Sequence, residues 1–117
     1  MTFKFNNVYI NETATITGPY ESNGPLGKYF DLCHKDLYFG ENNWEEAEEH
    51  LINEAIDTLV RKSKVEINSV DAFIGGDLLN QVVASNYAMM KLNKSFIGIY
   101  AACSTSSLGL ILGSALI

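Results

Sequence analysis

The last 23 residues of the chain, 95–117, contain no charged side chain. A segment of this length could cross a bilayer as a helix. Its middle, however, consists of Cys103 followed by four adjacent hydroxyl residues, 104–107. A buried strand over 95–100, a tight turn and a buried helix over 104–117 also explain the segment, because the core of an α/β protein excludes charge. We favour this second interpretation.

Two more strands are predicted upstream. Residues 8–17 are rich in β-branched side chains and end at Gly18-Pro19, which is typical of a strand. Residues 70–75 form a short apolar run that stops at Gly75-Gly76. The segment 20–40 between the first strand and the first helix is predicted to be irregular, and so long a segment is often functional.

Two more helices are also predicted. The clearest covers residues 43–62, where Asn43 can cap the start, and glutamates at the start and basic residues at the end suit the helix dipole. Its apolar positions recur at helical spacing: Trp44, Ala47, Leu51, Ala55, Ile56 and Leu59. A second helix is predicted to follow directly after Asp77, which can serve as its cap.

The resulting order is β-α-β-α-β-α, which predicts an α/β fold with all three strands parallel in one sheet and the last helix near its centre. That last helix is apolar on every side and must be covered by protein. In it, Gly109 and Gly113 indicate either close approach to another helix or a crowded centre. We therefore expect residues 1–117 to be the N-terminal part of a larger domain, and the chain to form a dimer or larger assembly.

Charge and cysteine content exclude several classes of protein. Eight basic and fourteen acidic residues give a net charge of −6, which disfavours binding to nucleic acid. Two cysteines make no disulfide framework and indicate a reducing compartment. The N-terminus lacks the basic and apolar regions of a secretory signal.

The junction at Cys103 is the strongest chemical signal. A cysteine between a parallel strand and a helix lies where open α/β sheets bind ligands. The helix start favours the thiolate, and its N–H groups can hold an oxyanion or a carboxylate. The structural alternative is a small buried cysteine in a tight turn, and the spacing alone does not choose between them.

Other motifs are weaker. Neither His34 nor His50 has a sequence relation to Cys103 that would make it a catalytic base. Cys33-His34 could be half of a metal site, but the spacing matches no zinc module, so no metal or cofactor is expected. Gly75-Gly76-Asp77 follows a strand but lacks the G-x-G-x-x-G pattern of a dinucleotide site.

Several segments together carry a resemblance to a known family. The most specific are Gly76-Asp77-Leu78-Leu79-Asn80-Gln81 and Ala102-Cys103-Ser104-Thr105-Ser106, supported by Gly24-Pro25-Leu26-Gly27 and Asn43-Trp44-Glu45. In these segments, which run in order from about residue 18 to the end, the chain resembles the stage V sporulation protein AD family of spore-forming Firmicutes. This family is thiolase-like in fold, and Cys103 matches the position of the thiolase nucleophile.

The resemblance implies a function. The family is associated with binding dipicolinic acid (pyridine-2,6-dicarboxylate) and with its uptake into the developing spore, alongside membrane-embedded proteins of the same operon at the spore inner membrane. A binding protein rather than an enzyme is therefore expected. If the two strand ends adjoin, the ligand would be held by neutral donors, from Cys103, Ser104, Thr105, Asn80 and Gln81. The alternative is a thiolase-type acyltransferase with Cys103 as nucleophile.

Overall fold

Helix α2, Trp44–Ser63, is the longest element of the computed structural model, which describes residues 2–117 except for the side chain of Asn80. The Asn43 side chain caps it by accepting a hydrogen bond from the Glu46 N–H at 2.8 Å. Lys64, with a φ of 57°, ends the helix in the left-handed conformation. The helix predicted over 43–62 is thus confirmed. Its cap could be predicted because Asn43 and Glu46 are only three residues apart in the sequence.

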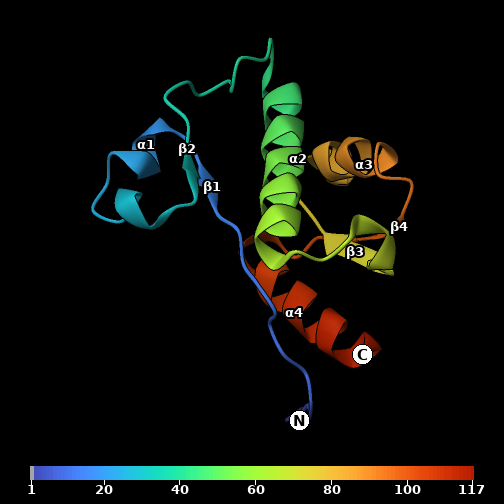
Figure 1. Ribbon diagram of the computed structural model, residues 1–117. Coiled ribbons are helices and arrows are strands. Elements are labelled where there is room, and N and C mark those ends of the chain that lie inside the picture. The colour runs from blue at the N-terminus through green and yellow to red at the C-terminus, as the bar shows by residue number, and fades with distance from the viewer. Residues whose placement is uncertain (1) are drawn as a thin grey trace.

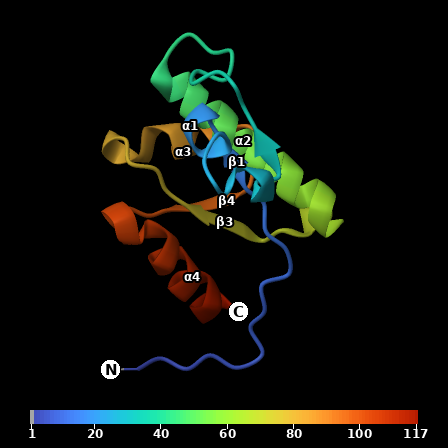
Figure 2. The same cartoon turned by 90° about the vertical axis from the view of Figure 1, so that its left-hand side faces the viewer.

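A parallel pair of strands forms the centre of the molecule. Strand β3, Ala72–Gly75, pairs with β4, Ser95–Gly98, in a register that places Phe73 opposite Phe96. Helix α3, Val83–Met90, connects them and packs beside α2, while α4, Thr105–Leu116, lies on the other face (Figure 2). This confirms that the second and third predicted strands pair in parallel.

The prediction of a single sheet is wrong, because the first strand pairs elsewhere. Only Ile16–Thr17 of the predicted segment forms a strand, β1, and it pairs in parallel with β2, Leu32–Cys33. The Asp31 carboxylate fixes this pairing by accepting hydrogen bonds from the N–H and the hydroxyl of Thr15. In Figure 1, β1 and β2 lie beside α2 on the side opposite α3.

The segment predicted to be irregular is partly regular. It contains β2, and it also overlaps a single helical turn, α1, at Pro19–Ser22 and a 3₁₀ turn at Gly27–Tyr29. A Cβ on Gly27 would lie 2.0 Å from the carbonyl oxygen of Ser22, so only glycine lets these two turns pack this closely.

Helix α3 begins later than predicted. Its first residue is Val83, and Gln81 and Val82 before it have positive φ angles of 61° and 56°. Asp77 still acts on the helix start, since its carboxylate accepts a hydrogen bond from the Ser85 N–H at 2.7 Å. Asp77 is therefore not the N-cap residue, which is Val82, but its carboxylate binds an N–H of the first turn across a loop.

Helix α4 packs on the sheet through its glycines. A Cβ on Gly109 would lie 3.5 Å from the Ile99 side chain, and one on Gly113 would lie 3.8 Å from Ile74. The glycine pair therefore faces the sheet and not another helix. None of its residues is fully buried, and its outer face exposes apolar side chains, among them Leu110, Ile111 and Leu116.

The described residues thus form a mixed α/β structure with two short parallel strand pairs and four α-helices. Its buried apolar core is small, and consists of Ala47, Ala84, Ala88, Met89 and Ile99. The uncharged segment 95–117 is divided between β4, a turn and α4, and within residues 2–117 no helix has both the length and the apolar character needed to cross a membrane.

Candidate functional site

Cys103 lies in a 3₁₀ turn, Ala102–Ser104, that connects β4 to α4. Ala102 has a φ of 46°, a left-handed conformation that is unfavourable for a residue with a Cβ. The turn directs Cys103 outward, and its side chain is exposed as a free thiol. The interpretation of Cys103 as a buried structural cysteine is therefore wrong.

Hydroxyl groups hold this turn in place. The Ser104 hydroxyl donates to the Ala101 carbonyl oxygen at 2.7 Å, and the Thr105 hydroxyl donates to that of Ala102 at 2.8 Å. The Thr105 oxygen also accepts from the Ala101 N–H at 3.0 Å. Each hydroxyl has one proton, and in this arrangement both protons are donated within the turn. Toward a ligand, these two oxygens can therefore only accept hydrogen bonds.

The two strand ends meet at this turn, as the sequence led us to expect. The Ile99 N–H donates to the Gly75 carbonyl oxygen at 2.9 Å, just beyond the paired strands. A Cβ on Gly76 would lie 1.9 Å from the Ile99 carbonyl oxygen, so the chains approach here as only glycine permits. Beside this contact, an open cavity of about 750 Å³ lies between the segments that follow β3 and β4.

The cavity is lined by both apolar and polar residues. Ile74, Ile99 and Leu110 supply apolar wall, while Cys103, Thr105 and Ser106 lie at the start of α4. Gly76, Asp77 and Leu78 form the side contributed by the end of β3. Helix α4 has no side-chain cap, and the N–H of its first residue, Thr105, donates to the Ala102 carbonyl oxygen. The N–H groups that follow in the first turn of a helix have no partner within it. These N–H groups can bind an anion.

A model of the family described as Stage V sporulation protein AD matches residues 1–117. The chain belongs to the stage V sporulation protein AD family. Stage V sporulation protein AD of Bacillus subtilis (strain 168) is 34% identical over 110 residues, which are 94% of this chain and 32% of that protein. The chain thus spans about a third of the length of this relative.

This member of the stage V sporulation protein AD family brings only some of the predicted ligand residues together. Cys103 and Thr105 line the cavity, and Ser104 lies in the adjoining turn. Gln81 is exposed and does not line the cavity, because the left-handed backbone at 81 and 82 carries it away. The Asn80 side chain lies outside the described part of the chain.

Asp77 is the wall residue that sequence reasoning missed as part of the site. It is 6% exposed, and its carboxylate accepts hydrogen bonds from the N–H groups of Leu79 and Ser85. Burial raises the pKa of the nearby Glu48 carboxyl, and the negative charge of Asp77 adds to this effect. The signal in the sequence was an aspartate directly after a glycine pair at a strand end.

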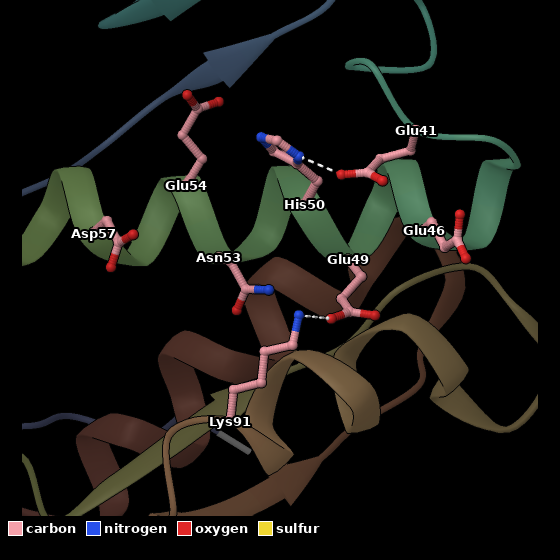
Figure 3. A pocket seen from close by; sticks show the side chains of 8 residues that line it. All are labelled: Glu41, Glu46, Glu49, His50, Asn53, Glu54, Asp57 and Lys91. Atoms are coloured by element: carbon pink, nitrogen blue, oxygen red, sulfur yellow. Dashed lines mark hydrogen bonds and ion pairs between the residues drawn. The ribbon is translucent and has the colours of Figure 1, made fainter.

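A second cavity, of about 520 Å³, lies along α2 and is lined mostly by carboxylates (Figure 3). Three of these carboxylates have a basic partner: His50 contacts Glu41 at 2.8 Å, Lys91 from the end of α3 contacts Glu49, and His34 contacts Glu54. Within residues 2–117 no group of three or more metal-binding side chains could hold an ion. Both histidines are thus engaged along α2, and neither lines the cavity at Cys103.

Proposed function

We propose that this chain acts in sporulation as part of a protein that binds dipicolinic acid and assists its uptake into the developing spore. The family to which it belongs carries sporulation in its name. The observation that carries the ligand proposal is the open cavity at the two strand ends, with an exposed Cys103 and the start of α4, which has no side-chain cap.

The chemistry of the cavity suits a planar aromatic dicarboxylate. One carboxylate would accept hydrogen bonds from the N–H groups at the start of α4, and the ring would pack against Ile74, Ile99 and Leu110. None of the described lining residues is cationic. The affinity must therefore come from neutral donors, and the two N–H groups that bind Asp77 reduce its repulsion of the ligand.

The proposal extends to the surroundings of the protein. We place it on a thiolase-like scaffold, peripheral at the spore inner membrane, with membrane-embedded sporulation proteins as partners. The exposed apolar face of α4 also supports association with a second copy of the chain.

Two substitutions of Cys103 test the ligand site. We expect Cys103→Ser to keep the dissociation constant for dipicolinate within about threefold, because the smaller hydroxyl still donates a hydrogen bond. We expect Cys103→Leu to weaken binding by at least about tenfold, because the larger side chain would occupy the space beside the start of α4. Calorimetric titration of the wild type and both variants measures the effect, and equal affinity in all three would contradict the proposal.

The same variants distinguish binding from catalysis. An acyltransferase would form a thioester between Cys103 and an acyl group from acyl-coenzyme A, and would need a base to activate the thiol. We expect mass spectrometry to find no acyl adduct after incubation with acetyl-coenzyme A. A stable adduct that is absent from Cys103→Ser would overturn the proposal in favour of an enzyme.

A further inference from the structure

The two residues before α3, Gln81 and Val82, form a strained kink. Both have positive φ angles, 61° and 56°, although both carry a Cβ that makes the left-handed conformation unfavourable. Val82 is also β-branched, a class of residue for which this conformation is exceptional. Strain of this kind persists only where surrounding contacts impose it, and it is common at switch regions.

Two side chains impose the kink from opposite sides. Asp77 accepts hydrogen bonds from the Leu79 N–H at 2.9 Å and from the Ser85 N–H at 2.7 Å. The Asn86 side-chain amide donates to the carbonyl oxygens of Gln81 at 3.1 Å and Val82 at 2.9 Å. These bonds offset the cost of the kink. A straight helix from Asp77 would lose the bond to the Ser85 N–H, because Ser85 lies eight residues along the chain.

A straight alternative is available to the same sequence. The pattern predicts a helix that starts directly after Asp77, with this aspartate as its local cap. The kink lies inside a 3₁₀ turn, Asn80–Val82, that directly precedes α3, so rotation of Gln81 and Val82 into the right-handed region would extend α3 back over this turn. The straight helix loses the clamp but relieves the strain, so each arrangement has a compensating advantage.

We infer that the kink at Gln81–Val82 is a two-state hinge that lets α3 begin either at Val83 or close to Asp77. Leu78 lies between Asp77 and the hinge, is 69% exposed, and forms part of the wall of the Cys103 cavity. A change of state therefore moves one wall of that cavity. The consequence for ligand binding rests on the proposed function, whereas the two states themselves do not.

Relaxation-dispersion NMR on the unliganded chain tests the hinge, because it detects exchange on the microsecond to millisecond timescale. We expect exchange at the amides of Leu79, Val83 and Ser85. Val82→Gly should abolish it, because glycine makes the kink unstrained, and Asn86→Ala should at least double it by removing half of the clamp. Flat dispersion in all three proteins, or exchange unchanged by both substitutions, would overturn the inference.

A matched pair of glycine substitutions measures the strain separately. Val82→Gly should raise the melting temperature by about 3 °C, whereas Val83→Gly, one residue later in right-handed helix, should lower it by about 4 °C. Equal falls in both variants would contradict strain at Val82.

Dipicolinate added to the wild type separates the two proposals. We expect it to change the exchange at these amides, because Leu78 lines the cavity. If calorimetry shows no binding while the variants behave as predicted, the hinge stands and the proposed ligand is wrong. If dipicolinate binds without changing the exchange, the coupling of hinge to cavity is wrong.

Discussion

At the scale of the residue, the backbone around Gly76 leaves no room for a side chain at the site. A Cβ there would lie 1.9 Å from the Ile99 carbonyl oxygen, which is backbone and cannot move aside cheaply. We expect Gly76→Ala to lower the free energy of unfolding by about 2–3 kcal/mol, measured by urea denaturation. Gly113→Ala is the control, because its Cβ would meet Ile74 at an ordinary 3.8 Å within a helix. Equal losses in both variants would contradict this account of the strand ends.

Single residues were predictable where their surroundings are local in sequence. Cys103 follows a strand and precedes a helix within a few residues, so its place at the strand ends could be read directly. Gln81 could not be placed, because its direction depends on a left-handed backbone held by Asp77 and Asn86. No propensity scale assigns that conformation to glutamine or to the valine that follows it.

At the scale of the element, capping and periodicity predicted α2 and the pairing of β3 with β4. The partner of β1 was not predictable, because β-branched composition favours a strand without choosing its neighbour. That choice depends on Asp31, which binds Thr15 across the β1–β2 pair and Lys62 at the end of α2. These contacts join residues that are 16 and 31 positions apart in the sequence.

The Asp31–Lys62 contact gives a pH-dependent prediction. The Lys62 ammonium, 2.7 Å away, holds the pKa of the Asp31 carboxyl below its ordinary value, and the Thr15 N–H adds to this. Because the folded-state pKa is lowered, the stabilisation is present above about pH 4 and is lost as the pH falls through the lowered pKa. We therefore expect Lys62→Met to raise the pKa of Asp31 in an NMR titration and to reduce stability at pH 6 but not in strong acid.

Lys28→Met is the matched control, because its ammonium lies over the Tyr29 ring at 5.0 Å. This variant should leave the titration of Asp31 unchanged. If Lys62→Met also leaves it unchanged, the lysine does not hold β2 to α2 in solution.

At the scale of the whole molecule, the exposed apolar surface of α4 is the dominant feature. The described chain spans about a third of its relative from Bacillus subtilis, and its buried apolar residues are mostly alanine. An exposed helix face of this kind marks an interaction surface or an aggregation hazard. The sequence predicted the apolar character of this helix, but not which face would contact the sheet, since that depends on the close fit of Gly109 and Gly113.

Association through α4 can be measured with a pair of equally exposed leucines. Leu116 on α4 is 64% exposed and Leu26 in the segment before β2 is 62% exposed. We expect light scattering to find the wild type and Leu26→Lys as dimers or larger assemblies, and Leu116→Lys shifted toward monomer, because the charge resists burial. A monomeric wild type at working concentration would contradict this prediction.

The central claim is that dipicolinate binds at the two strand ends, and amide chemical shifts of the isotope-labelled chain test it most directly. On titration with dipicolinate, we predict saturable shifts at Gly76, Asp77 and Leu78 and at residues 102–106, with none on addition of pyridine, which lacks the carboxylates. Absence of shifts, or shifts confined to the acidic cavity along α2, would contradict the account.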